Sequence, residues 1–281
     1  KPEVFLIDAT AFCYRAFYAL RNLSTSFGQP TNAIYGFLNI LNKIIKEEDP
    51  QFLAVCFDVS RETFRQKKFA EYKVQRPPMP DDLVSQIPLI KEIIRAKGIA
   101  LIEKSGFEAD DIIATLARKA QAAGFKVKVV SSDKDMLQLV NKDIAVLSPQ
   151  KDQNVLYDEQ KVFERFGVKP NQINDIIALM GDDVDNIPGV KGIGEKTAVS
   201  LLKQFGSLDN LLENLDNLTQ EKLKKAIREN KALVELSREL SVLDDKIELD
   251  SNIDDLVIRP ADNQELYRIF KRLEFKRFLK D

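Results

Sequence analysis

Three short apolar segments, VFLID (4–8), FLAVCFD (52–58) and VKVVSSD (127–133), decide the fold, because each of them ends in an aspartate. Their length and apolar character are typical of buried strands in a parallel sheet. Helix-period patterns lie between them, notably at 83–98 and 110–124. The alternation predicts an α/β domain, in which the carboxyl ends of the strands gather the aspartates at one edge of the sheet.

The second part of the chain has a different pattern. After about Pro170 the strand signal disappears, and helical patterns separated by glycines continue to the end. We therefore expect an α/β domain at residues 1–170 and an all-helical domain at 171–281. The length of 281 residues agrees with two domains of about 150 residues each.

The composition excludes several kinds of site. The chain has no histidine, which rules out imidazole bases, Ser-His-Asp triads and histidine-ligated zinc. Its two cysteines, Cys13 and Cys56, can form neither a disulfide framework nor a cysteine-rich zinc site. No apolar run approaches the ~20 residues of a membrane span, and the first residues lack a signal-peptide pattern. We expect a cytoplasmic protein without membrane contact, whose chemistry uses carboxylates, basic groups, hydroxyls or metal.

Carboxylates are the main candidates for a functional site. Asp8, Asp58 and Asp133 end the expected strands, and the segments 108–111 and 133–135 add further acids. Any one of them is explained as well by a helix cap or a turn. Together at one sheet edge they would repel one another unless cations neutralised them. Oxygen ligands of this kind select Mg²⁺ or Mn²⁺, and two such ions can hold a phosphodiester for attack by water.

Basic residues are concentrated in one segment, although the net charge is only −2. Residues 61–76 (RETFRQKKFAEYKVQR) combine basic side chains with aromatic rings, which suits a phosphate backbone and stacked bases. For a single basic segment, a solvated amphipathic helix would be the simpler explanation. The residues expected to contact DNA here are Arg65, Lys67, Lys68 and Tyr72.

A glycine-rich segment, GVKGIGEKT (189–197), is the second nucleic-acid signal. Its spacing approaches that of a phosphate-binding P-loop, but Glu195 interrupts the motif and no expected strand precedes it. Flanking helical patterns favour a helix-hairpin-helix, whose backbone N–H groups face a phosphate without reading base sequence. The residues expected to contact DNA there are Gly189, Gly192, Gly194, Lys196 and Thr197.

Several motifs together resemble the 5′ nuclease domain of bacterial DNA polymerase I, which belongs to the flap endonuclease family. They are FLID (5–8), YRAF (14–17), FD (57–58), YKVQRPPMPDDL (72–83), EADD (108–111), SSDKDMLQLV (131–140) and LMGDDVDNIPGVKGIGEKTA (179–198). The resemblance covers essentially the whole chain, and the combination is far more specific than any one motif.

The resemblance implies a three-layer, PIN-like α/β nuclease domain with a parallel sheet and a helical arch at about 61–95, followed by the helix-hairpin-helix domain. It implies two divalent metal ions, Mg²⁺ or Mn²⁺, with K⁺ as a further candidate at the hairpin. Lys73 and Arg76 match the cationic pair of the arch, and Arg15 matches a basic residue near the scissile phosphate. The implied metal cluster consists of Asp8, Asp58, Glu108, Asp110, Asp111, Asp133, Asp135, Asp182 and Asp185, acting directly or through water.

The function implied is a monomeric, metal-dependent, structure-specific 5′ nuclease that hydrolyses DNA flaps or RNA primer ends in replication and repair. Its expected partners are branched or flapped DNA and RNA–DNA primer junctions. We also expect an excised domain with an attached polymerase in the full-length protein, because the chain starts without Met and lacks polymerase motifs. A free-standing nuclease is the other possibility.

Two other functions stay open at this point. One is a non-catalytic DNA-junction binder of the same fold, which metal-dependent hydrolysis would exclude, and the intact acid set argues against it. The other is a P-loop-like nucleotide hydrolase, which nucleotide turnover would reveal. The inserted Glu195 argues against this second alternative.

Overall fold

A single six-stranded sheet, in the order β3-β2-β1-β4-β5-β6, forms the centre of the structure. The computed structural model describes residues 1–59, 62–150 and 153–279. Strands β1 to β5 are parallel, as the sequence predicts, whereas the short β6 is antiparallel to β5. The strands are β1 (Glu3–Asp8), β2 (Phe52–Phe57), β3 (Ala100–Glu103), β4 (Lys126–Val130), β5 (Ile144–Ser148) and β6 (Val155–Tyr157).

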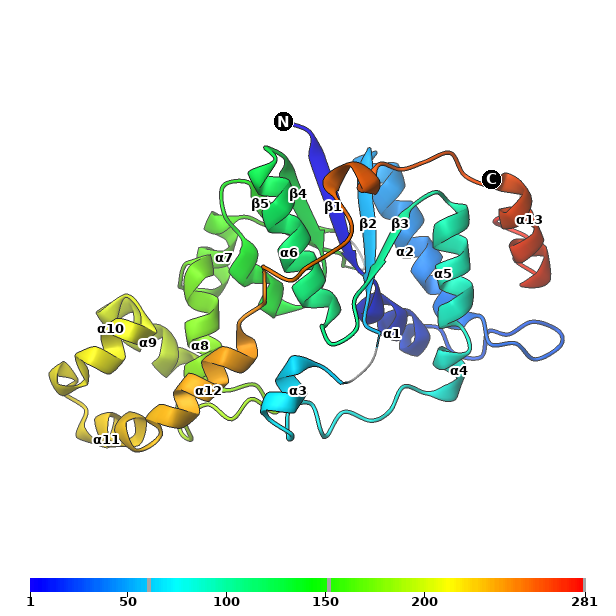
Figure 1. Cartoon of the computed structure of the whole chain (residues 1–281). Coiled ribbons are helices and arrows are strands. Elements are labelled where there is room, and N and C mark those ends of the chain that lie inside the picture. Colours follow the sequence, from blue (N-terminus) through cyan, green and yellow to red (C-terminus); the bar gives the residue numbers. More distant parts are fainter. Residues whose placement is uncertain (60–61, 151–152, 280–281) are drawn as a thin grey trace.

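Helices cover both faces of the sheet and make up most of the second half of the chain (Figure 1). The α-helices are α1 (Ala9–Ala19), α2 (Asn32–Glu48), α3 (Phe64–Lys68), α4 (Asp81–Val84), α5 (Ile87–Ala96), α6 (Ala109–Ala122), α7 (Glu159–Phe166), α8 (Ile173–Met180), α9 (Glu195–Phe205), α10 (Leu208–Glu213), α11 (Glu221–Glu229), α12 (Lys231–Ser241) and α13 (Asn263–Arg272). The 3-10 helices are η1 (Lys134–Leu139), η2 (Pro170–Gln172), η3 (Leu215–Asn217) and η4 (Ile253–Leu256). Within the described ranges, no helix is both long and apolar enough to cross a membrane.

The central strand β1 explains why its sequence is apolar without interruption. Val4 and Leu6 face one hydrophobic core, and Phe5 and Ile7 face the other. Successive residues of a strand point to opposite faces, so a strand covered on both sides needs an apolar residue at every position. Glu3 at the exposed start of the strand and Asp8 at its buried end bound this apolar run.

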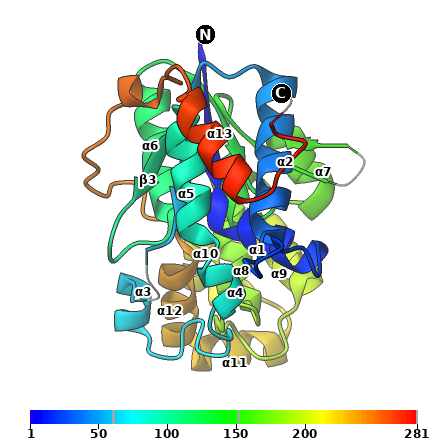
Figure 2. The same cartoon turned by 90° about the vertical axis from the view of Figure 1, so that its right-hand side faces the viewer.

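The two cores are built from different helices. Helices α1, α2, α5 and α13 pack on one face of the sheet, and Figure 2 shows α13 alongside α5. Helix α6 packs on the other face, and its core continues without a break into α8, α9 and α12 of the helical part. The helical part is therefore joined to the α/β part by shared apolar packing.

The segment 83–98, expected as one helix, forms two. Helix α4 ends at Val84 and α5 begins at Ile87. Between them lies Gln86, whose buried side chain accepts hydrogen bonds from the N–H groups of Ala33 and Ile34, at 2.8 and 3.2 Å. The break therefore places a polar side chain where it satisfies the first N–H groups of α2.

The last part of the chain returns to the α/β part, so the expected 171–281 domain does not pack as one unit. Val257 pairs with Phe52 at the start of β2, and the N–H of Arg259 donates to the carbonyl of Gly98 at 2.9 Å. Helix α13 then lies against α5. The sequence pattern could not show this, because an amphipathic helix does not reveal which surface it covers.

Replacing Gly98 with alanine is expected to lower the free energy of unfolding by about 3 kcal/mol, from left-handed strain and overpacking together. Gly98 has φ +70°, and a Cβ there would lie 2.1 Å from the carbonyl oxygen of Arg259. The control is Gly124→Ala, where φ is +88° but the Cβ would meet open space, so only about 1 kcal/mol is expected. Urea unfolding measures both variants, and equal losses would contradict the close contact.

Candidate active site

Three of the predicted acids lie at the carboxyl ends of adjacent strands, as the sequence suggests. Asp8 ends β1 and accepts a hydrogen bond from the N–H of Ala11, at 3.3 Å, at the start of α1. Asp58 follows β2 and accepts one from the N–H of Ala109 in α6, at 2.7 Å. Asp133 follows β4 and caps η1. In Figure 1 this edge of the sheet faces α1 and α3.

Two further groups of acids meet these aspartates. Glu108 and Asp110 lie at the start of α6, where the helix dipole favours negative charge. Asp182 and Asp185 come from the loop after α8, in the helical part. The side chain of Asp182 organises that loop, because it accepts a hydrogen bond from the N–H of Val184, at 2.8 Å. The acids at this edge therefore come from both parts of the chain.

Several of these carboxylates are buried close to one another, and the cations near them do not outweigh the effect of burial on their pKa. Burial, followed by repulsion from Asp58, raises the pKa of Asp8 to about 7. Burial and then Asp133 raise the pKa of Asp135 to about 8, and its Oδ1 has no hydrogen-bond partner among the described residues. Burial is also the largest cause that raises the pKa of Asp58, Asp110 and Asp133.

Other acids of the group are neutralised by basic side chains. Burial alone would raise the pKa of Glu108, but Lys73 and Arg65 outweigh it, so that the pKa is lowered. Burial likewise opposes ionisation of Asp182, yet the ammonium of Lys134, at 2.7 Å, brings its pKa below the usual range. In one part of the site, nearby cations therefore lower the pKa of the carboxylates. In the other part, burial raises it.

Lys73 and Arg76 reach this group from the basic segment. The Nζ of Lys73 lies 2.5 Å from Oε1 of Glu108 and 3.6 Å from Oδ2 of Asp185. Arg76 donates a hydrogen bond to Oδ1 of Asp185. Both predicted cations thus lie among the acids, where a phosphate would also have to bind.

The backbone around Lys73 is attached to the loop that carries Asp185. Its N–H donates to the carbonyl of Asp185 at 2.9 Å, and the amide of Asn186 donates to the carbonyl of Glu71 at 2.7 Å. Lys73 itself has φ +54°, a conformation that lysine rarely adopts. These contacts hold the basic segment against the helical part.

Part of the segment 61–95, expected as an arch, packs in the core. Position 61 lies outside the described residues, and α3 with the turns after it crosses the acidic edge. Helix α5 packs in the core instead, where Ile90, Ile93 and Ile94 are fully buried. The apolar residues repeat with a helical period over 83–98 because one face of this segment packs in the core. The period does not indicate a free-standing arch.

Three predicted site residues are enclosed in the protein. Asp111 has no exposed surface, and both of its oxygens accept from Arg65, so we do not propose it as a metal ligand. Arg65 is itself buried in that pair and cannot reach DNA. Tyr72 is buried too, and its hydroxyl donates to Oε2 of Glu108 at 3.1 Å. We no longer assign DNA contacts to Arg65 and Tyr72.

The other basic residues of α3 are accessible. Lys67 and Lys68 are exposed, and Lys68 forms an ion pair with Glu239 of α12. An exposed pair of this kind contributes little to stability and can be exchanged for a phosphate. Lys67 and Lys68 therefore remain candidates for contact with DNA.

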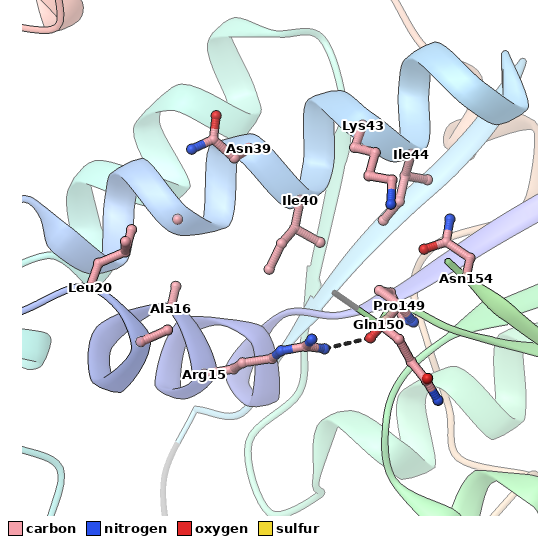
Figure 3. Close-up of a pocket in the computed structure, with 12 residues that line it drawn as sticks. Arg15, Ala16, Leu20, Asn39, Ile40, Lys43, Ile44, Pro149, Gln150 and Asn154 are labelled. Carbon is pink, nitrogen blue, oxygen red and sulfur yellow. Dashed lines mark hydrogen bonds between the residues drawn. The ribbon is translucent and has the colours of Figure 1, made fainter. Parts of the chain in front are cut away.

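Arg15 lies beside the acids, next to a pocket of about 310 Å³ between α1, α2 and the residues after β5. Figure 3 shows its guanidinium directed at the carbonyl of Pro149, to which it donates at 2.6 Å. It also donates to the hydroxyl of Ser132, the neighbour of Asp133, at 3.4 Å. A second cation, Lys43 of α2, also lines the pocket. Arg15 is thus held near Asp133.

The glycine-rich segment forms the predicted hairpin between α8 and α9. Gly192 and Gly194 are exposed, and so is Lys196 in the first turn of α9, with Thr197 half-buried behind it. Gly189 is buried instead, and a Cβ there would lie 2.2 Å from the backbone nitrogen of Gly181. Gly189 therefore serves close backbone packing and not DNA contact. The last strand before this hairpin in the described ranges is β6, so a P-loop arrangement does not occur.

Sequence reasoning missed the residues that hold the acids in place. Lys134 pairs with Asp182, Ser131 donates to Oδ2 of Asp8 at 3.0 Å, and Thr10 accepts from the N–H of Asp58 at 3.1 Å. The sequence marks these three residues only by their position, because each lies within two residues of an acid at the end of a strand. Adjacency alone does not show which partner a side chain will meet across the fold.

An α/β domain with carboxylates at its strand ends, joined to a helix-hairpin-helix, defines a class of nuclease. The chain belongs to the 5′-3′ exonuclease family: residues 3–167 match its N-terminal resolvase-like domain, and residues 168–264 match its C-terminal SAM fold. The 5′-3′ exonuclease of Aquifex aeolicus is 45% identical over 278 residues, which cover 99% of this chain and 94% of that protein.

The family also includes parts of longer proteins. DNA polymerase I of Bacillus caldotenax is 42% identical over 281 residues, and the match covers 99% of this chain but 32% of the polymerase. Among solved structures, bacteriophage T5 5′-exonuclease with bound zinc ions has a TM-score of 0.71 at 20% identity, covering 97% of this chain and 98% of that one. At this identity, the likeness shows the fold.

Proposed function

We propose that the chain is a divalent-metal-dependent, structure-specific 5′ nuclease that hydrolyses phosphodiester bonds at DNA flaps and RNA primer ends in replication and repair. The observation that carries the proposal is the set of buried carboxylates with raised pKa at the sheet edge, faced by cations from another segment. The name of the Aquifex relative supports the activity. A T5 flap endonuclease of the same fold, in complex with DNA and metal ions, supports the substrate class.

The carboxylates with raised pKa are the residues that would hold Mg²⁺ or Mn²⁺. The Oδ1 of Asp135 has no hydrogen-bond partner among the described residues, and burial with repulsion from Asp58 raises the pKa of Asp8, so both carboxylates could gain from a bound cation. In the described part of the chain, no three acidic or thiol groups are yet close enough to bind one ion, so binding would draw them together. When bound, a pair of divalent ions supplies charge stabilisation to the phosphodiester and activates water for attack.

The chain's own groups have separate tasks in this reaction. Ser131 fixes the rotamer of Asp8, and Asp58 ties the end of β2 to the start of α6. Lys73 and Arg76 offer positive charge where the phosphate would lie, and would exchange their carboxylate partners for it. Arg15 would hold the strand from the side of α1.

The hairpin and α3 would hold the duplex part of the substrate. The exposed backbone at Gly192 and Gly194 with Lys196 can meet a phosphate without reading base sequence. K⁺ at the hairpin remains a prediction, which binding assays in K⁺ and in Na⁺ would test. An attached polymerase is likewise a proposal, supported by the polymerase relatives.

Replacing Gly194 with valine is expected to weaken duplex binding about tenfold, because the side chain would keep a phosphate from the backbone N–H groups. Gly194 has φ −98°, which any residue adopts, so the variant tests the contact and not backbone strain. The measurement is the Kd for two duplexes of unrelated sequence. A loss on only one of the two duplexes would contradict phosphate recognition.

One experiment tests the proposed function directly. A 5′-labelled flap, an RNA-primed duplex and a blunt duplex are incubated with Mg²⁺, with Mn²⁺ or with EDTA, and product sizes are read on a gel. We expect cleavage at the flap junction and at the primer end, and none in EDTA. Tight flap binding without cleavage would favour the non-catalytic junction binder, and ATP turnover would favour the nucleotide hydrolase.

A further inference from the structure

Arg65 is the largest fully buried side chain of the described residues, with 1% of its surface exposed. Every nitrogen of its guanidinium donates a hydrogen bond. Nη1 donates to Oε2 of Glu108 at 2.9 Å and to Oδ2 of Asp111 at 2.7 Å. Nη2 donates to Oδ1 of Asp111 at 2.7 Å and to the carbonyl of Val242 at 2.6 Å, and Nε donates to the carbonyl of Leu240 at 2.9 Å.

These contacts join three segments that are distant in sequence. Arg65 belongs to α3 at the base of the arch, Asp111 to the start of α6, and Leu240 to the last turn of α12 in the helical part. The last carbonyls of a helix have no partner within it, and a cation is favourable there. One side chain therefore caps α12, pairs with α6 and holds α3 between them.

The same guanidinium determines how Glu108 is oriented. Oε2 of Glu108 accepts hydrogen bonds from Arg65 and from the hydroxyl of Tyr72, which leaves Oε1 for Lys73 at 2.5 Å. Without Arg65, the carboxylate would lose a charged partner on one oxygen and could rotate. Lys73 would then lose its fixed position among the acids.

We propose that Arg65 is a positioning residue of the nuclease: it orients Glu108, and through it Lys73, and it sets the base of the arch against the helical part. The inference rests on the proposed function, because its kinetic consequence needs a cleavage reaction. Arg65 touches neither substrate nor reacting atoms in this role. A misplacement of about 1 Å in groups around the reacting centre typically costs about 10²-fold in rate.

A second ion pair between the same elements provides a matched control. Arg118 of α6 pairs with Asp245, just beyond α12, at 3.1 Å, with 38% and 32% of the two side chains exposed. This pair joins α6 to the segment after α12, as Arg65 does, but it has no contact with Glu108 in the described structure. Arg118→Gln therefore removes an inter-segment arginine without disturbing the acids.

The test variant must not leave a buried charge alone. Arg65→Gln by itself would leave Asp111 buried and uncompensated, which destabilises strongly. The double variant Arg65→Gln/Asp111→Asn removes both charges. The single carbonyl oxygen of the asparagine can still accept from the N–H of Asp244, which Oδ1 of Asp111 binds at 2.9 Å, and only the longer contact of Oδ2 with the N–H of Glu108, at 3.2 Å, is lost.

For the double variant, we expect the single-turnover cleavage rate at saturating enzyme to fall about 10²-fold, with flap Kd within about threefold of wild type. Arg65→Lys keeps the charge, but a single ammonium cannot reproduce the paired donors of the planar guanidinium. The cleavage rate of this variant should therefore also fall. Arg118→Gln should cleave at the wild-type rate. If Arg65 only stabilised the fold, the cleavage rate would instead change in step with thermal stability. Arg65→Lys would then restore both the rate and the stability.

A measurement on the DNA-free protein does not depend on cleavage. Trypsin should cut after Lys67 or Lys68 much faster in the double variant and in Arg65→Lys than in wild type or Arg118→Gln, because α3 is released. Unchanged proteolysis, or a folded double variant with a rate within threefold of wild type, would overturn the inference. If the wild type does not cleave flaps, the proposed function fails while the proteolysis still tests the positioning by Arg65.

Discussion

Replacing Asp8 or Asp133 with asparagine is expected to lower the cleavage rate by at least about 10³-fold, while binding of flap DNA is kept or becomes tighter. Each substitution removes one charge from the carboxylates that would hold divalent ions, whose charge stabilisation is worth several kcal/mol. The same loss of charge reduces repulsion toward the phosphate backbone. Rate and affinity therefore move in different directions, which a loss of folding would not produce.

The measurement is single-turnover cleavage of a labelled flap in Mg²⁺, together with the Kd of the same flap in Ca²⁺ or EDTA. Asp143→Asn is the matched control, because Asp143 lies beyond the opposite end of β4 and pairs with Lys1 and Lys126. It should cleave at the wild-type rate. Wild-type turnover in either test variant would remove that aspartate from the metal cluster.

Replacing Lys73 with alanine is expected to lower the single-turnover rate at saturating enzyme by at least about 10²-fold. Its ammonium is held between Glu108 and Asp185, and those carboxylates together with Tyr72 keep its pKa well above the usual value although burial opposes this. The charge is thus held in place, and in the proposed function it would face the charge that develops on the phosphoryl group. Flap affinity should change little, because many other phosphate contacts remain.

Lys67→Ala is the control for Lys73→Ala, since Lys67 belongs to the same basic segment but is exposed on α3. It should weaken flap binding slightly and reduce the dependence of Kd on salt, with no effect on the saturated rate. If Lys73→Ala cleaves within a few fold of the wild-type rate, Lys73 contributes only to DNA binding, as we expect for Lys67.

Much of the fold and part of the site could be predicted from local patterns. Apolar strands buried on both faces cannot be mistaken for amphipathic helices, and the residue after such a strand lies at the sheet edge. β3 and β6 escaped prediction because strands of four and three residues contain too few positions to show a period. β5 also escaped, although it is as long as β4. The return of α13 to α5 also escaped, because packing partners at long range leave no local signal.

What the sequence by itself determined is the chemistry available: no imidazole, many carboxylates at strand ends, and a basic segment with a glycine hairpin. Only the tertiary structure decided which of these groups act together. Asp110 and Asp111 are adjacent and chemically identical, but a helix turns about 100° per residue, so one faces the acids and the other faces Arg65. For the same reason Arg65 is buried while Lys67, two residues later in α3, is exposed, because burial depends on which face of the helix meets α6 and α12.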